Sequence, residues 1–245
     1  MSLPWVRYEI KYRVDPDTLA EFRARTRAIL VADPYSVNGV GYDNYSTYFD
    51  SPELRYSRGK EEGLEIRTKP RLRIYKRPED HEPLAHFFEL KHRRGMAATK
   101  ERVVIPASMA PSLLDPIYLG SDAVSSFSPV LARLAYLVRR HDLRPVVCVL
   151  YRREAHSCPL APGLRITFDR LLSASSRTAV DTPPRLFQPV LPFNETIIEV
   201  KYNARMPNWL AHVVQRLEID RVSVSKYVTA MQSLAFGRSS DVPRQ

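Results

Sequence analysis

The chain has little of several features that define common classes of protein. It contains only two cysteines, Cys148 and Cys158, with no CxxC pair and no Cys/His cluster at zinc-binding spacing. A disulfide framework is therefore not expected, and the reducing cytoplasm is the expected location. The phosphate-binding loop GxxxxGK(S/T) is also absent from the sequence, which excludes nucleotide binding by that route.

Segments that direct a chain to a membrane are missing as well. No apolar run approaches the roughly 20 residues that a membrane-spanning helix needs. The N-terminal stretch MSLPWVRYEI has neither the basic nor the apolar region of a signal peptide. If the protein works at a membrane, we expect a membrane-protein partner to bring it there.

Basic residues outnumber acidic ones. The chain has 37 Lys and Arg against 27 Asp and Glu, a formal net charge of +10 over 245 residues. Such a balance points to an anionic partner, which is a nucleic acid, a phosphate-rich metabolite or an acidic membrane surface. The charge alone does not choose among these partners, and a solvated basic surface is the alternative.

The pattern of apolar residues predicts strands and helices in an irregular order. Strands are expected at residues 6–14, 45–51, 71–77, 86–93, 99–106, 144–156, 163–170 and 195–203. Helical regions are expected at residues 14–31, 51–66, 107–142 (two helices with a break at 120–126), 207–217 and 223–236. Residues 93–98, RRGMAA, are expected to form a hairpin loop.

Strands at both ends of the chain, with helices inserted between them, predict an α+β fold. The connections do not alternate as in a βαβ fold, so the sheet is expected to be largely antiparallel. Residues 1–236 are expected to form a single domain, followed by a polar tail at residues 237–245.

Three of the predicted strands share an E-x-K pattern, in YEIKY (8–12), FELKH (88–92) and IEVKY (198–202). Side chains in a strand alternate between two faces, so the acid and the lysine of each pattern share one face. Other strands also present polar residues on one face: Arg71, Arg73 and Tyr75; Lys100 and Arg102; Tyr151 and Arg153; Arg165, Thr167 and Asp169. A sheet with one wet face and one core face is the simple interpretation of each strand alone.

Taken together, these polar faces are dominated by Arg and Lys, which repel one another unless an anion binds there. A sheet closed into a barrel with this face inward would form a basic tunnel, with flanking helices on its apolar outer face. The carboxylates would then offer hard oxygen ligands to Mg²⁺ or Mn²⁺. The candidate ligands are Glu9, Glu89, Glu199 and Asp169.

The order of these motifs resembles the triphosphate tunnel metalloenzyme (CYTH-like) superfamily. Within it, the phrases STYFDSPEL, RLRIY, LYRREA, LRITFD, IEVKY and VSVSKY are similar to the vacuolar transporter chaperone (VTC) domain over residues 6–235. The resemblance implies an antiparallel tunnel barrel and a phosphotransferase that makes polyphosphate from ATP with a divalent metal, Mn²⁺ or Mg²⁺. The partners that it implies are ATP and polyphosphate or a triphosphate.

The resemblance also implies roles for single residues. The phosphate-binding set is Lys11, Arg71, Arg73, Lys91, Lys100, Arg102, Arg153, Arg165, Lys201 and Lys226. Within it the catalytic residues are Arg71, Arg73, Arg153, Arg165 and Lys201. Glu199 matches the metal ligand of the family, and Glu9 and Glu89 are secondary acidic positions.

The sequence departs from the eukaryotic VTC pattern in two respects. It shows no phosphate-sensing domain before the barrel and no membrane segment after it, so regulation and translocation in the eukaryotic manner are not expected. The short RRGMAA loop also lacks the longer acidic link, containing tryptophan, of the eukaryotic domain.

Two other functions remain open at this point. The same tunnel can hydrolyse a nucleoside triphosphate or inorganic tripolyphosphate if water replaces the phosphate acceptor, and Glu9 is then the candidate for orienting that water. A basic sheet can also bind nucleic acid, but such sheets need exposed central aromatics, and repeated carboxylates oppose phosphate binding without a metal.

Overall fold

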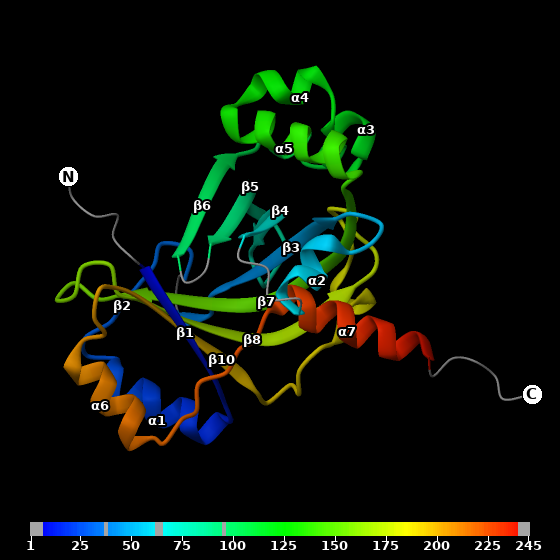
Figure 1. Cartoon of the computed structure of the whole chain (residues 1–245). Helices are drawn as coiled ribbons and strands as arrows, with labels where there is room; N and C mark the ends of the chain where they lie inside the picture. Colours follow the sequence, from blue (N-terminus) through cyan, green and yellow to red (C-terminus); the bar gives the residue numbers. More distant parts are fainter. Residues whose placement is uncertain (1–6, 37–38, 62–65, 95–96, 240–245) are drawn as a thin grey trace, which may run out of the picture. The chain divides into compact units, whose positions relative to one another are not determined.

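The computed structural model describes residues 7–36, 39–61, 66–94 and 97–239 (Figure 1). Its strands are β1 (Arg7–Val14), β2 (Val31–Ala32), β3 (Tyr42–Asp50), β4 (Ile66–Lys76), β5 (Pro83–Arg94), β6 (Ala97–Val104), β7 (Arg144–Ser157), β8 (Arg165–Ser175), β9 (Gln188–Pro189) and β10 (Thr196–Asn203). Its helices are α1 (Pro16–Thr26), α2 (Arg55–Glu61), α3 (Pro116–Leu119), α4 (Asp122–Phe127), α5 (Pro129–His141), α6 (Asn208–Arg216) and α7 (Lys226–Ser239).

All of the predicted strands are present, but β4 begins at Ile66, where a helix over 51–66 was expected to end, and the short strands β2 and β9 were not predicted. The other differences concern the helices. Helix α1 ends at Thr26, and residues Val31–Ala32 pair with β7 as strand β2 instead of continuing the helix. The region 107–142 contains three α-helices and two 3-10 turns, and α4 occupies the expected break. Helix α7 continues to Ser239, so the tail predicted from residue 237 begins inside a helix. Of the predicted RRGMAA loop, residues 95–96 lie outside the described residues, and the flanking residues belong to β5 and β6.

Contacts divide the chain into two compact units, each made of separate segments. The first unit comprises Met1–Asp43, Tyr151–Leu172 and Leu191–Val224, and the second comprises Asn44–Leu150, Ser173–Val190 and Ser225–Gln245. Strands β7 and β8 contribute residues to both units. The expectation of one domain over residues 1–236 stays a prediction.

In the first unit the strands follow the order β1-β10-β8-β7, and their described pairings are antiparallel. Apolar residues on one face of this sheet pack against α1 and α6, which lie side by side (Figure 1). Helix α1 begins where the sequence predicts, because Asp15 Oδ1 accepts from the Thr18 N–H at 2.9 Å and Pro16 occupies the first turn. The opposite face of these strands carries the charged residues.

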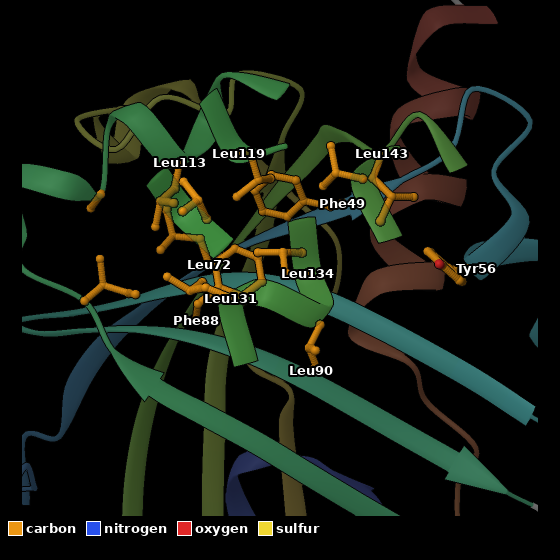
Figure 2. Close-up of a cluster of buried hydrophobic side chains, with 14 residues drawn as sticks. Phe49, Tyr56, Leu72, Phe88, Leu90, Leu113, Leu119, Leu131, Leu134 and Leu143 are labelled. Carbon is orange, nitrogen blue, oxygen red and sulfur yellow. The ribbon is translucent and has the colours of Figure 1, made fainter. Parts of the chain in front are cut away.

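In the second unit the order is β7-β3-β4-β5-β6, with antiparallel pairing from β4 to β6. One face of these strands carries Leu72, Phe88 and Leu90, which pack against Leu131 and Leu134 of α5 (Figure 2). The alternation of the strands turns the neighbouring residues Arg71, Arg73 and Glu89 to the opposite face.

These pairings confirm an α+β fold with a mostly antiparallel sheet. The ten-stranded path runs β1-β10-β8-β7-β3-β4-β5-β6, with β2 and β9 beside it. Within the described residues the path ends at β1 and at β6, so the expected closure into a barrel is not part of this pairing. Among the same residues no helix is both long and apolar enough to cross a membrane.

Candidate functional site

The first and last E-x-K patterns lie on neighbouring strands of the first unit. The register of β1 and β10 places Glu9 opposite Lys201 and Lys11 opposite Glu199. Lys11 Nζ lies 3.4 Å from Glu9 Oε1 and 3.9 Å from Glu199 Oε2. Lys201 Nζ lies 3.7 Å from Glu9 Oε2 and also contacts Glu199. Each acid therefore faces the lysine of the other strand, which stabilises an antiparallel pair.

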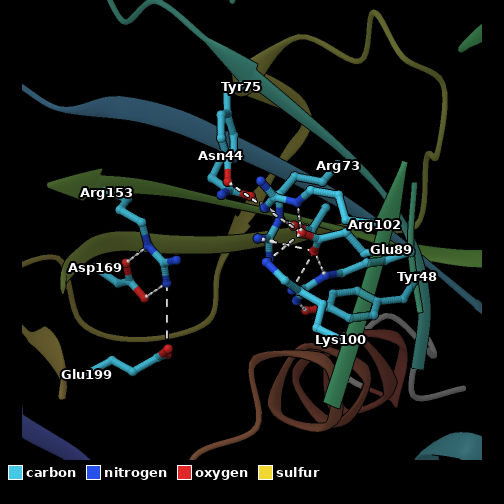
Figure 3. A network of polar contacts seen from close by, with 12 residues as sticks. Asn44, Tyr48, Arg73, Tyr75, Glu89, Lys100, Arg102, Arg153, Asp169 and Glu199 are labelled. Atoms are coloured by element: carbon cyan, nitrogen blue, oxygen red, sulfur yellow. Dashed lines mark hydrogen bonds and ion pairs between the residues drawn. The ribbon is translucent and has the colours of Figure 1, made fainter. Parts of the chain in front are cut away.

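A second ion pair of the same unit adjoins Glu199. Arg153 donates from Nε and Nη2 to the two carboxylate oxygens of Asp169, at 2.6 and 2.7 Å (Figure 3). Its Nη2 also lies 3.9 Å from Glu199 Oε2. Burial lowers the pKa of Arg153, but Asp169, Tyr151 and Glu199 raise it well above its ordinary value. Arg153 is thus a fixed cation, and Asp169, a candidate metal ligand in the sequence, is engaged by it.

The backbone of Arg153 lies close to that of Gly41. Gly41 has a φ of +78°, and a Cβ at this residue would lie 2.3 Å from the Arg153 carbonyl oxygen. Only glycine allows the segment before β3 to pass so near to β7.

Two further polar residues of β8 belong to the first unit. Arg165 lies opposite Lys201 in the register, and its Nη2 donates to Asp33 Oδ2 at 2.6 Å. Thr167 lies opposite Glu199. The Thr167 hydroxyl is buried and has no hydrogen-bond partner among the described residues.

The middle E-x-K pattern forms a separate cluster in the second unit, centred on Glu89 of β5. In the register Glu89 lies between Arg71 of β4 and Arg102 of β6. Arg71 Nε donates to Oε2 at 2.7 Å, and Arg102 Nε donates to Oε1 at 2.6 Å. Arg73 Nη1 lies 3.3 Å and Lys100 Nζ 3.5 Å from the same carboxylate (Figure 3). We call these five residues the Glu89 cluster.

The charges of the Glu89 cluster determine its protonation. The Glu89 side chain has 0% exposure. Burial by itself raises the pKa of its carboxyl group, but the four surrounding cations lower the pKa to well below the ordinary value. Burial is the main reason that the pKa of Lys100 is lowered to about 8, and the neighbouring arginines lower it further while Glu89 raises it. The carboxylate therefore stays ionised at neutral pH.

Two tyrosines and a lysine extend the cluster. The Tyr48 hydroxyl accepts from Arg71 Nη1 at 3.2 Å, and the Tyr75 hydroxyl accepts from Arg102 Nη2 at 3.3 Å. Burial raises the pKa of Tyr48, but Arg71, Arg73 and Lys226 together bring it below its ordinary value. The charge of Lys226, at the start of α7, therefore acts on the Tyr48 hydroxyl.

The predicted site residues thus fall into two sets. The first unit holds Glu9, Lys11, Arg153, Arg165, Glu199 and Lys201. The second unit holds Arg71, Arg73, Glu89, Lys91, Lys100, Arg102 and Lys226. The predicted site residues did not include Asp33 or Lys69. Lys69 carried a visible signal, because it precedes Arg71 by two residues in a strand and so shares its face.

The carboxylates differ in their fitness to hold a metal ion. In the described part of the chain no group of three or more His, Cys, Asp or Glu side chains is gathered for a metal. A protein site for Mg²⁺ often supplies only one or two carboxylates, with substrate phosphates and waters completing the shell. Glu9 and Glu199 fit this role better, because the two carboxylates lie together around Lys11 and Lys201 and Glu9 is partly open to solvent. Glu89 fits it poorly, because four cations already surround its oxygens.

A mostly antiparallel sheet that carries arginines and lysines around buried glutamates agrees with what the sequence resemblance to the triphosphate tunnel metalloenzymes predicted. The VTC domain family matches residues 6–235, and the chain belongs to this family.

Solved structures agree with this assignment at the level of the fold. The chain is similar to a "putative adenylate cyclase" from Vibrio parahaemolyticus, with 14% identity and a TM-score of 0.50 over 93% of this chain and 98% of that one. It is also similar to a "putative adenylate cyclase" from Bacillus halodurans, with 12% identity and a TM-score of 0.52 over 90% of this chain and 94% of that one. A search of the curated proteins finds no match.

Proposed function

We propose that the chain is a metal-dependent polyphosphate polymerase, which transfers the γ-phosphate of ATP to a growing polyphosphate chain. The observation that carries the proposal is the Glu89 cluster, where four cations surround a single buried carboxylate. Such an excess of positive charge on one strand face is stable with a multiply charged anion bound to it. Membership of the VTC domain family makes a phosphate chain the anion that fits best.

The tunnel is part of this proposal. We propose that the sheet closes as a barrel with its charged face inward, as the superfamily implies. The separation of an apolar face from a charged face, seen within each unit, supports this arrangement.

The chemistry needs positioning and charge neutralisation more than a covalent intermediate. An oxygen of the terminal phosphate of the growing chain attacks the γ-phosphorus of ATP, the bond to the β-phosphate oxygen breaks, and ADP leaves with the electron pair. The attacking oxygen is already ionised, so no strong general base is required. Arg71 and Arg73 are the proposed clamps for the phosphates, and their guanidinium groups are held in place by Glu89.

Glu199 is the proposed metal ligand, with Glu9 beside it. A divalent ion bound there would neutralise charge on the phosphate oxygens. Arg153 orients Glu199 from one side while it holds Asp169, and Lys11 and Lys201 balance the charge of the two glutamates when the metal is absent.

The test is incubation of the purified protein with ATP and Mn²⁺, followed by measurement of ADP and of polymer. We expect ADP and long-chain polyphosphate in matching amounts. Glu199→Gln should need at least about 10-fold more Mn²⁺ for half-maximal activity, since it removes one charged ligand. Glu21→Gln, an exposed acid of α1 that pairs with Arg25, is the matched control. If folded, metal-loaded protein releases neither ADP nor polymer, the proposal fails.

Hydrolysis of a triphosphate is the second candidate. The Glu9 side chain is 24% exposed, against 6% for Glu199, so it is the more accessible of the two acids to water. Release of orthophosphate without polymer in the same assay would favour this function.

Nucleic-acid binding is less well supported by the aromatic residues. Tyr48 and Tyr75 are only 5% and 4% exposed. Tyr48 stacks on Tyr227, with ring centroids 4.9 Å apart. A base-stacking sheet needs such rings free on its surface. The cytoplasmic location and a membrane-protein partner remain proposals.

A further inference from the structure

Arg165 of β8 is held by an aspartate that lies outside the strands of the sheet. Its Nη2 donates to Asp33 Oδ2 at 2.6 Å. Asp33 follows directly after β2, the two-residue strand that pairs with β7, and both Asp33 and Arg165 belong to the first unit. Arg165 is one of the predicted catalytic arginines, so a residue that orients its side chain bears on the reaction.

Contacts other than the one with Arg165 fix Asp33 in place. Its N–H donates to the carbonyl oxygen of Ala155 in β7 at 2.8 Å. Its Oδ1 accepts from the Tyr35 N–H at 2.8 Å, which is the geometry of an Asx turn. Ser36 closes the same turn, because its N–H donates to the Asp33 carbonyl oxygen and its Oγ accepts from the Ala155 N–H, both at 2.8 Å. The carboxylate of Asp33 is therefore a rigid anchor attached to the backbone of β7.

This anchor engages only part of the Arg165 guanidinium group. The contact with Asp33 uses Nη2, and the Arg165 side chain is 38% exposed. Arg153 is held differently, since its Nε and Nη2 both donate to Asp169 and its side chain is only 9% exposed (Figure 3). An arginine has five N–H donors, so the contact through Nη2 leaves most donors of Arg165 for an incoming anion.

A partly exposed arginine gains from such an anchor. Its long side chain has many rotamers, and a bound ligand must restrict them at a cost in free energy. Phosphoryl transfer depends on charged groups that are already in position when the substrate binds. An acid fixed to the backbone supplies part of this order before the substrate arrives.

We propose that Asp33 is a positioning residue, which holds the Arg165 guanidinium group in the orientation that contacts the reacting phosphates. The inference rests on the proposed function. Charge and position predict opposite effects of removing Asp33. Its negative charge alone repels an anionic substrate, so charge alone predicts tighter binding and no loss of rate. A positioning role predicts a slower reaction although the repulsion is gone.

The test is the steady-state release of ADP from ATP by the purified protein with Mn²⁺. Asp33→Asn should lower kcat about 10-fold and change the KM for ATP less than about threefold, because the cation is kept but misplaced. Arg165→Gln should lower kcat at least as much. In a protein that already carries Arg165→Gln, adding Asp33→Asn should change kcat less than about twofold, because the residue that it positions is gone.

Two further variants separate this role from charge and from folding. Asp142→Asn removes an equal charge from an exposed pair with Arg144 and should change neither kcat nor KM. Ser36→Ala removes one bond of the turn and keeps the contact between Asp33 and Arg165, so kcat should stay within about twofold. Urea unfolding of each variant shows that it is folded under the conditions of the assay.

Several results would overturn the inference. Unchanged turnover in Asp33→Asn would deny the role, and faster turnover would make Asp33 a competitor of the substrate for Arg165. An equal loss in Ser36→Ala would assign the effect to the turn as a whole. A further loss of about 10-fold on adding Asp33→Asn to Arg165→Gln would mean that Asp33 acts through another group.

Failure of the proposed function gives a different result. Wild-type protein that releases orthophosphate without polymer would contradict polymerisation alone, since the same variants then test the inference on the rate of hydrolysis. Wild-type protein that releases neither ADP nor orthophosphate would contradict the proposed function and the inference with it.

Discussion

The Glu89 side chain is fully buried, and burial alone would favour its neutral form. The surrounding cations reverse this preference, so its folded-state pKa lies below the unfolded value of about 4.3. A carboxyl group with a lowered pKa stabilises the fold above the unfolded pKa and loses this contribution as pH falls toward the folded value. The contribution of Glu89 is therefore complete at neutral pH and decreases only in acid.

Replacing Glu89 by Gln should destabilise the protein strongly. The change leaves buried cations without their counter-ion, a loss of about 3–5 kcal/mol in the free energy of unfolding. Urea unfolding at pH 7 measures it. Tripolyphosphate should raise the melting temperature of Glu89→Gln more than that of the wild type, because the anion replaces the missing charge. If Glu89 is instead a metal ligand, added Mn²⁺ will stabilise the wild type more than the variant.

We expect Lys100 to make phosphate binding depend on pH. Its pKa of about 8 is below the unfolded value of about 10.4. Between these two pKa values the unfolded chain keeps the Lys100 proton and the folded chain has lost it. The contribution of Lys100 to stability is therefore least favourable below about pH 8 and rises as the pH increases from about 8 to about 10.4. A bound anion favours the charged lysine, so affinity should do the opposite and fall above about pH 8.

Calorimetric titration with tripolyphosphate from about pH 7 to pH 10 checks this expectation. The affinity of the wild type should fall more steeply than that of Lys100→Met, and the difference between the two proteins removes the ionisation of the ligand itself. Parallel profiles would show that Lys100 does not titrate in contact with the anion.

For single residues, the sequence predicted which side chains of one strand share a face. The shared faces of Glu9 and Lys11, or of Arg71 and Arg73, follow from a period of two. Partners across strands did not follow, because register depends on residues far apart in the chain. Thus Asp169 was read as a possible metal ligand, although it pairs with Arg153.

At the scale of elements, Asp50 joins the end of β3 to two helices. Its Oδ1 accepts from the Tyr56 N–H at 2.8 Å, and its Oδ2 accepts from the Ser57 N–H at 2.9 Å. The Tyr227 hydroxyl of α7 donates to the same Oδ2. The pKa of Tyr227 is raised, mainly by burial and next by the negative charge of Asp50, so this hydroxyl keeps its proton. The contact anchors the start of α7, which carries Lys226.

Removing that hydroxyl should loosen α7. Tyr227→Phe deletes a buried hydrogen bond to a charged acceptor, worth about 1.5–3 kcal/mol in the free energy of unfolding. Tyr136→Phe on α5 is the matched control, since this tyrosine is 59% exposed. Urea unfolding measures both variants. An equal, small effect in the two would show that the contact with Asp50 does not stabilise the fold.

The elements were predicted best where their signals are local. Ser121 and Ser128 are the N-cap residues of α4 and α5, and their side chains accept from the N–H groups of Val124 and Leu131. These serines explain why the region 107–142 divides into more helices than expected. Strand β2 lacked such a signal, because Val31 and Ala32 are extended through pairing with β7.

For the whole molecule, composition and strand patterns predicted the α+β class and an anionic partner. The order of strands did not follow from them, since β1 pairs with β10 across most of the chain. The division into two units was not expected either, because each unit is assembled from three distant segments. Long-range contacts of this kind leave no local pattern in a sequence.

The net charge of +10 predicts a strong dependence of binding on salt. A protein that neutralises phosphates of a linear polyanion releases the condensed counterions, so log affinity falls linearly with log salt, more steeply when more phosphates are neutralised. Long-chain polyphosphate, which has more charged groups to engage the predicted phosphate-binding cations, should therefore have a steeper slope than tripolyphosphate. Calorimetric titrations between about 50 and 200 mM salt measure both slopes.

Comparing the slope of each variant with that of the wild type shows how many phosphate contacts the replaced residue makes. Lys91→Met should reduce the slope for polyphosphate by nearly one, since each neutralised phosphate adds about 0.7–0.9 to it. Arg140→Met, at an exposed position of α5, should alter neither slope if the contacts are local, because exposed charges more than about 10 Å from a ligand are screened at 0.1 M salt. Equal slopes for the two ligands would mean that they occupy the same cations, and a change in Arg140→Met equal to that in Lys91→Met would assign the binding to diffuse surface charge.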